Sequence, residues 1–196
     1  MTSPVYWHPL FYQSVMRVLY GKHFEERYRA LAELIPENVS VTEVCMGDAY
    51  LYRHYLKQKN IEYVGLDMNP VFVAGALRRD IDAHYHNVAA DPIPSADYII
   101  MQASLYQFMP EHKPIVKKLL DAATNTFILA EPVKNLAASS NPLLSCIGKY
   151  SANPGHKHAV NRFNRDSLLD FFHQFKEFKE SKEIKGGREL IGIFKK

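Results

Sequence analysis

The stretch that decides the fold is Val41-Thr-Glu-Val-Cys-Met-Gly-Asp-Ala49, followed by Ile61-Glu-Tyr-Val-Gly-Leu-Asp67-Met-Asn-Pro70. Each begins with a short apolar run typical of a buried strand, and Gly47 marks a tight turn into a helix. Asp67 ends the second run, 20 residues after Gly47. At about this spacing a carboxylate lies beside the ribose of a nucleotide held at the turn. The pair predicts a cofactor site, although the turn has one glycine where such turns usually have two or three.

The composition is that of a globular protein. Of 196 residues, 47% are hydrophobic and 23% are charged, and the formal net charge is +3. A chain of this length is expected to form one domain that buries about 70% of its unfolded surface. The weak charge argues against nucleic acid as a partner. No run approaches the ~18 apolar residues of a membrane span, and no signal peptide is visible, so we expect a cytoplasmic protein. The oligomeric state is left open.

Neither the cysteines nor the histidines predict a metal site. Cys45 and Cys146 have no metal-type spacing, which favours two reduced thiols. His84 and His86 are spaced as a possible ligand pair, but no cluster of cysteines or carboxylates accompanies them. We therefore expect no bound metal.

Strand and helix patterns alternate along the middle of the chain. Residues 8–35 have helical periodicity, which Gly21 divides and Pro36 closes. Short apolar strands are predicted at 40–46, 61–67, 97–102 and 126–131, and helices at 49–58, 70–79 and 111–123. This alternation predicts a doubly wound α/β sheet with mostly parallel strands.

The end of the chain departs from this alternation. Residues 132–163 contain chain-breaking residues around a short apolar helix near 141–149. The elements predicted next are a helix at 166–174, capped by Asn164 or Asp166, and strands near 177–184 and 188–195. Lys185-Gly-Gly187 predicts a hairpin between these strands.

The order of these elements and the quoted motifs resemble the class I S-adenosylmethionine-dependent methyltransferases over roughly residues 24–196. The resemblance implies a seven-stranded sheet, mostly parallel with a C-terminal antiparallel hairpin, and S-adenosyl-L-methionine as the cofactor. The single domain of residues 1–196 would comprise an N-terminal helical arm (1–36), a cofactor-binding half (37–131) and an acceptor-side segment with the closing hairpin (132–196).

In that family the first strand ends in an acidic-x-Gly-x-Gly-x-Gly turn. Glu43 falls at the acidic position and Gly47 at the central glycine, whereas Cys45 and Ala49 stand in place of the outer two. A glycine suits position 47 because cofactor and backbone must approach closely. Asp67 matches the acid that binds the ribose hydroxyls, or it simply caps the next helix. Glu43, an acid inside an apolar strand, needs a partner. It either caps nearby loop amides or, as the resemblance implies, lies near the amino-acid end of the cofactor or orders the loop.

The resemblance implies further cofactor contacts after the second, third and fourth strands. Met68 follows Asp67 directly, and either Asn87 or Asp91 contacts adenine. Gln102 ends the fourth strand. Tyr106, in the loop after it, either closes over the sulfonium, since an aromatic ring attracts a cation, or packs in the core.

A hydroxyl or amine acceptor requires a base in addition to positioning. The candidates are His156 and His158, in the loop before the last helix, and Glu131 at the end of the fifth strand. The plain alternative for both histidines is a solvated loop side chain. No Asp/Asn-Pro-Pro-Tyr run follows the fourth strand, which argues against methylation of a nucleic-acid base.

We expect methyl transfer from S-adenosyl-L-methionine to a small-molecule acceptor that the sequence does not identify. The alternative is a catalytically inactive, methyltransferase-like protein that binds the cofactor or another protein, which the replaced glycines and the lack of an obvious base favour. A nicotinamide-dependent oxidoreductase is a third possibility. The terminal hairpin and the absence of a Gly-x-Gly-x-x-Gly run argue against it.

Overall fold

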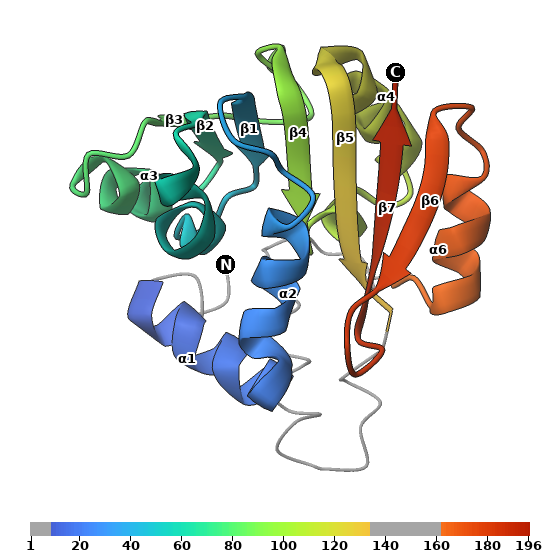
Figure 1. Cartoon of the computed structure of the whole chain (residues 1–196), viewed down its shortest axis with the longest axis horizontal. Helices are drawn as coiled ribbons and strands as arrows, with labels where there is room; N and C mark the ends of the chain where they lie inside the picture. Colours follow the sequence, from blue (N-terminus) through green and yellow to red (C-terminus); the bar gives the residue numbers. More distant parts are fainter. Residues whose placement is uncertain (1–8, 134–161) are drawn as a thin grey trace.

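The computed structural model describes residues 9–133 and 162–196, and in it helices cover both faces of one seven-stranded sheet (Figure 1). The strands are β1 (Ser40–Val44), β2 (Glu62–Asp67), β3 (Ala83–Tyr85), β4 (Ala96–Gln102), β5 (Ala123–Pro132), β6 (Phe178–Glu183) and β7 (Glu189–Lys195). The helices are α1 (Pro9–Tyr20), α2 (Phe24–Ala32), α3 (Pro70–Leu77), α4 (His112–Ala122) and α6 (Arg165–Phe172), with short helical turns η2 (Gly21–His23), η3 (Tyr52–Leu56), η4 (Lys57–Lys59) and η5 (Leu105–Phe108). No helix within the described ranges is long and apolar enough to cross a bilayer.

The sheet is parallel except at its C-terminal end. Its strand order is β3-β2-β1-β4-β5-β7-β6. The first five strands in this order pair in parallel, whereas β7 runs antiparallel between β5 and β6. The predicted fold class, a doubly wound and mostly parallel sheet closed by an antiparallel hairpin, is confirmed.

Alternating side chains of the central strands build two cores, one on each face of the sheet. On β5, Ile128 and Ala130 pack in the core beneath α1, α2, η3 and α3, whereas Phe127 and Leu129 pack in the core beneath α4 and α6. All four side chains are fully buried. Because both faces are covered, the middle of the strand, Phe127 to Ala130, is apolar without interruption.

The N-terminal helices are held to the sheet by a buried ion pair. Gly21, with φ 53°, separates α1 from α2, as predicted. Arg27 of α2 lies 2.8 Å from Glu189 of β7, and both side chains are almost completely buried. The Arg27 guanidinium also lies 4.2 Å from the centroid of the Tyr20 ring. The arm is thus part of the folded body and lies over the end of the sheet at which β7 begins.

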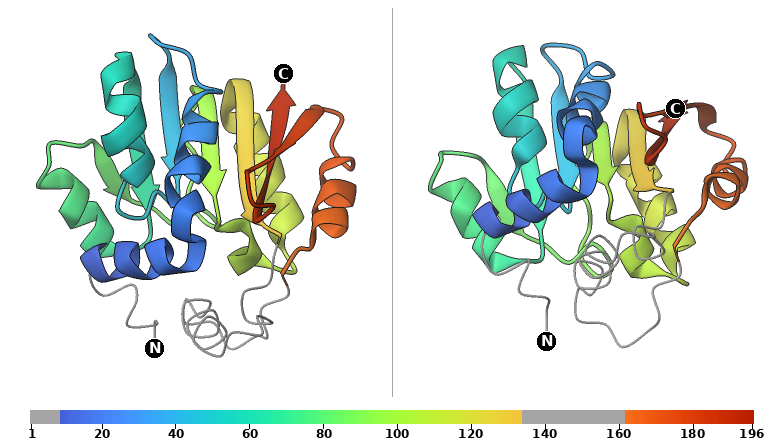
Figure 2. Two further views of the ribbon diagram at one scale, coloured as in Figure 1. Left: turned by 60° about the horizontal axis from the view of Figure 1, so that its bottom comes forward. Right: turned by 90° about the horizontal axis from the view of Figure 1, so that it is seen from below.

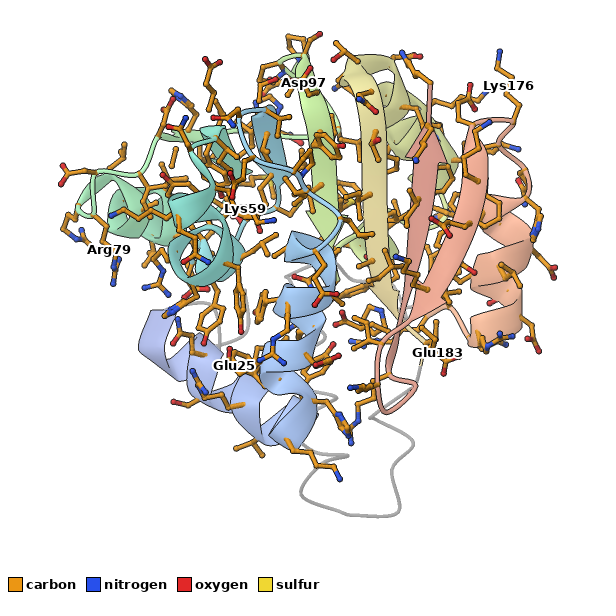
Figure 3. All side chains as sticks on the ribbon, in the orientation of Figure 1. Glu25, Lys59, Arg79, Asp97, Lys176 and Glu183 are labelled. Atoms are coloured by element: carbon orange, nitrogen blue, oxygen red, sulfur yellow. The ribbon has the colours of Figure 1, made fainter. Side chains whose placement is uncertain are left out.

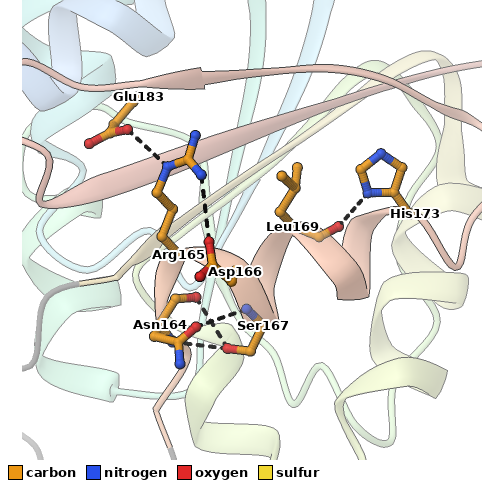
Figure 4. A network of polar contacts seen from close by, with 7 residues as sticks. All are labelled: Asn164, Arg165, Asp166, Ser167, Leu169, His173 and Glu183. Atoms are coloured by element: carbon orange, nitrogen blue, oxygen red, sulfur yellow. Dashed lines mark hydrogen bonds and ion pairs between the residues drawn. The ribbon is translucent and has the colours of Figure 1, made fainter.

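The terminal hairpin and its helix form for reasons visible in the sequence. Gly186 and Gly187 have φ values of 92° and 60°, which suit glycine and turn the chain from β6 to β7. Asn164, rather than Asp166, caps α6: its side chain accepts the Ser167 amide at 2.8 Å, and the Ser167 hydroxyl accepts the Asn164 amide at 3.0 Å (Figure 4). This reciprocal arrangement is a capping box.

One predicted strand ends early, one predicted helix is irregular, and one strand was missed. The strand expected at 40–46 ends at Val44. The helix expected at 49–58 is present at 50–59, after a left-handed Ala49, and contains the π-helix η3 and the 3-10 helix η4. Strand β3 had no apolar signal because only Ala83 of its three residues is buried. The helix expected near 141–149 lies outside the described residues.

Candidate functional site

The carboxyl ends of the parallel strands meet at one edge of the sheet. The chain moves from β1 through β2 to β3 on one side and then crosses to β4 and β5 on the other. The order therefore reverses between β1 and β4. Ligands of open α/β sheets bind at such a reversal, outside the carboxyl ends of the strands. In Figure 1 the arrowheads of β4 and β5 point toward the side of the molecule on which α1 lies.

The turns after β1 and β4 have left-handed backbone at four positions. Cys45, Gly47 and Ala49 have φ values of 57°, 59° and 56°, and Ala103 has a φ of 53°. Left-handed backbone costs a residue with a Cβ atom about 1–2 kcal/mol. The turn after β1 thus keeps, at all three positions of the resembled glycine motif, a conformation that glycine adopts most readily. Backbone strain gathered at a switch point is a feature of functional sites.

Asp67 joins the turn after β1 to the end of β2. Its Oδ2 accepts the Gly47 amide at 2.8 Å, and its Oδ1 accepts the Asn69 amide at 2.7 Å. Burial raises the pKa of Asp67 to about 6, against the opposing effect of these two hydrogen bonds. The helix α3 is capped by Asn69, whose side chain accepts the Val71 amide at 2.9 Å. Each oxygen of Asp67 keeps a second lone pair for a ligand hydroxyl.

Glu43 and Asp48 both bind protein groups beside this turn. Glu43 is 4% exposed, and its Oε2 accepts the Tyr63 hydroxyl at 2.7 Å. Burial raises the pKa of Glu43 to about 8, and the charges of Asp48 and Asp67 raise it further. Asp48 pairs with Arg53 at 2.9 Å and accepts a hydrogen bond from Gln13 of α1. Glu43 therefore binds β2 beside the turn, and Asp48 joins α1 to the turn.

Glu131 holds the turn that follows β4. It is 1% exposed, and its Oε1 accepts the amides of Ser104 and Leu105, each at 2.7 Å. Its Oε2 is buried and has no hydrogen-bond partner among the residues that the structure describes. Burial raises the pKa of Glu131 to about 7, although the backbone amides lower it. Burial also raises the pKa of the Cys45 thiol, and the charges of Asp67 and Glu131 add to the effect, so both carboxyl groups lie near this thiol.

The other predicted cofactor residues lie along the same edge, and several have protein partners. The Gln102 amide donates to Glu189 at 3.2 Å, so its side chain is turned toward the ion pair that holds α2. Tyr106 is 8% exposed, and the Arg162 guanidinium lies 4.7 Å from the centroid of its ring. Arg162 was not predicted, because a single arginine in a loop gives no sequence signal.

Asn87 and Asp91 belong to one turn after β3. The Asp91 carboxylate accepts the Asn87 amide at 2.8 Å, and the Asn87 side chain accepts the Ala89 amide at 3.1 Å. The structure brings both residues together and does not select one of them for adenine. Met68 is 51% exposed just after Asp67, so its thioether side chain is available to a ligand at this edge.

The remaining candidates are histidines. His156 and His158 lie outside the described residues. His84 pairs with Asp82 at 2.9 Å on the surface, and burial lowers the pKa of His86. Within 9–133 and 162–196, no three histidine, cysteine, aspartate or glutamate residues are grouped as metal ligands.

Comparisons with known proteins show a shared fold at low sequence identity. No family model and no curated protein matches the chain. A chain in the complex between the Haloferax volcanii Trm112 methyltransferase activator and a candidate methyltransferase is 14% identical, with a TM-score of 0.72 over 100% of this chain and 98% of that one. Magnesium protoporphyrin IX methyltransferase from Synechocystis PCC 6803, with bound SAH, is 12% identical, with a TM-score of 0.66 over 94% of each chain.

The same fold also carries other chemistry. The [4+2]-cyclase SpnF is 16% identical, with a TM-score of 0.60 over 83% of this chain and 61% of that one. The chain therefore has the fold of class I S-adenosylmethionine-dependent methyltransferases. The reaction of this chain depends on the residues of its site, because a fold does not determine a function.

Proposed function

We propose that this chain is an S-adenosyl-L-methionine-dependent methyltransferase that acts on a small-molecule acceptor. The observation that carries the proposal is the hydrogen bond of 2.8 Å from the Gly47 amide to Asp67, made inside a turn that is left-handed at positions 45, 47 and 49. This contact lies at the edge where α/β sheets bind ligands. A structure of the same fold with bound SAH supports the choice of cofactor.

The described residues fit the parts of this cofactor. The turn at 87–91 lies after β3 and suits adenine, and Asp67 after β2 keeps lone pairs for the two ribose hydroxyls. The turn after β4, held by Glu131, is left for the methionine end. When bound, the cofactor supplies an electrophilic methyl carbon. The protein then has to position the acceptor and to receive its proton.

Three residues are candidates for the proton acceptor. His156 and His158 are candidates by their place in the chain alone. Glu131 is a candidate by geometry, and its pKa of about 7 lies near the range in which a general base works at neutral pH. The Arg162 guanidinium already covers one face of the Tyr106 ring, which leaves that face closed to the sulfonium.

The inactive, cofactor-binding alternative rested on the two replaced glycines and on the lack of an obvious base. Cys45 and Ala49 hold the left-handed backbone without glycine, so this argument loses force for cofactor binding. The replaced glycines still bear on catalysis, because the Cys45 side chain adds volume to the turn and so affects how the cofactor is positioned. Turnover is therefore the property that separates the two functions.

A labelling experiment tests turnover. The protein is incubated with S-adenosylmethionine labelled in its methyl group and with a panel of phenols, amines, thiols and carboxylates. We expect SAH to form only in the presence of one acceptor class, with the label on that acceptor. Binding of the cofactor without transfer to any panel member or to fractions of a cell lysate would favour the inactive alternative.

A further inference from the structure

Glu131 is a buried carboxylate of the candidate site, and only one of its two oxygens has a hydrogen-bond partner among the described residues. Its Oε1 already satisfies two backbone amides, at 2.7 Å each. Its Oε2 is equally shielded from water, yet no described residue donates a hydrogen bond to it. A buried carboxylate oxygen without a donor is unfavourable, and folded proteins retain such groups where a ligand, an ion or a water molecule completes them.

Its position points to a ligand. Glu131 lies at the carboxyl end of β5, and the two amides that it binds belong to the turn that leaves β4. Its charge reaches the Cys45 thiol in the turn after β1, as does that of Asp67 at the end of β2. Glu131 is thus adjacent to both turns that flank the switch point.

The other donors of the proposed cofactor already have acceptors along this edge. Asp67 is placed for the ribose hydroxyls, and the turn at 87–91 for the amino group of adenine. The donor that remains is the α-ammonium group of the methionine end, which is also the one with a full positive charge. A carboxylate oxygen is its strongest hydrogen-bond acceptor.

We propose that Glu131 Oε2 binds the α-ammonium group of the cofactor, while Oε1 holds the turn after β4 against it. The inference rests on the proposed function, since it takes S-adenosylmethionine as the ligand. It removes Glu131 from the candidate bases, because an oxygen that binds the ammonium is not free to receive the acceptor's proton. The role of base then falls to another group.

Glu131→Gln tests this contact without removing the support of the turn. The glutamine carbonyl still accepts the amides of Ser104 and Leu105, whereas its NH₂ group replaces Oε2 and repels an ammonium. Calorimetric titrations compare SAH with its desamino analogue, S-adenosyl-4-thiobutyrate, in which hydrogen replaces the amino group. The wild-type protein is expected to prefer SAH by at least about tenfold, and the variant to lose that preference.

The matched control is Asp97→Asn. The Asp97 carboxylate also accepts a backbone amide, that of Ser40, at 2.9 Å. It lies at the edge of the sheet opposite to Glu25 and the N-terminal helices (Figure 3). This variant should keep the wild-type preference. An equal loss of affinity for both compounds in Glu131→Gln would mean that Glu131 acts only through the turn, and a wild-type protein without preference would also overturn the inference. No binding of SAH to the wild type would instead refute the proposed function.

Discussion

We expect cofactor binding to depend most on Asp67, because its carboxylate accepts the Gly47 amide and would face the ribose in the proposed site. We expect Asp67→Ala to weaken S-adenosylmethionine binding at least about tenfold, since two charge-assisted hydrogen bonds of about 1.5–3 kcal/mol each are lost. Calorimetry measures the affinity. The control is Asp97→Ala, which removes a carboxylate that also accepts a backbone amide but lies at the opposite edge of the sheet. This variant should bind S-adenosylmethionine with unchanged affinity. Equal affinities for wild type and Asp67→Ala would show that the ribose role is wrong.

Three acids with raised pKa values make the stability of the ligand-free protein depend on pH. Burial raises the pKa of Glu43 to about 8, of Glu131 to about 7 and of Asp67 to about 6. A raised pKa means that the native state holds protons that the unfolded state releases, so stability is greatest in acid and falls as pH rises through these values. Urea unfolding should show a free energy lower by more than about 1.4 kcal/mol at about pH 8.5 than at about pH 5.5.

Glu43→Gln supplies the control for this titration. The glutamine keeps an acceptor for the Tyr63 hydroxyl but cannot ionise, so the decline between about pH 7 and 9 should become shallower. A free energy of unfolding that rises with pH over this range would contradict the assignment of raised pKa values.

The sequence predicted only some of the residues of the candidate site. The spacing of Gly47 and Asp67, which reflects the length of one strand–helix–strand unit, predicted that they lie together, and a hydrogen bond of 2.8 Å joins them. The role of Glu131 as the support of the turn was not found, because Ser104 and Leu105 bind it through backbone amides that leave no trace in residue type. Gln102 was placed at the site by its strand, but its side chain binds Glu189, a partner 87 residues away.

Among the elements, α6 and β7 show most directly how close packing limits the sequence. A Cβ atom at Gly192 of β7 would lie 2.7 Å from the Phe172 ring of α6. Gly192→Ala should therefore lower the free energy of unfolding by about 1–3 kcal/mol, measured in urea. Lys182→Ala, at an exposed position of the neighbouring β6, should change it by less than about 0.5 kcal/mol. If the two variants were equally stable, the ring would be free to move aside.

Elements with a continuous apolar run were predicted well, and elements without one were not. The buried strands β1, β2, β4 and β5 were each found within a few residues of their bounds. Strand β3 lies at the edge of the sheet and exposes two of its three residues, so it has no hydrophobic pattern. Its place in the sheet comes from pairing with β2, which is a tertiary effect.

For the whole molecule, the buried pair of Arg27 and Glu189 links the first helices to the last strand. Arg27→Ala leaves a buried carboxylate without its cation and should cost about 3–5 kcal/mol of unfolding free energy. Arg29 lies two positions further along the same helix and forms an exposed pair with Glu26 at 3.4 Å. Arg29→Ala should cost less than about 0.5 kcal/mol. Similar losses for both variants in urea unfolding would mean that the buried pair does not hold the arm.

Topology is what connects this chain to its structural neighbours. At identities of 12–16%, the likeness to solved structures is one of fold, with TM-scores of 0.60 to 0.72. The order of elements was therefore a better predictor of the fold than any motif. Long-range pairs such as Arg27 and Glu189 were beyond prediction, because their partners meet only once the sheet is complete.

Calorimetric titration of the wild-type protein with S-adenosyl-L-methionine tests cofactor binding itself, because it depends on neither the acceptor nor catalysis. We expect saturable heat with one site per chain, and no heat with a nicotinamide dinucleotide under the same conditions. The absence of heat at millimolar S-adenosyl-L-methionine would contradict it.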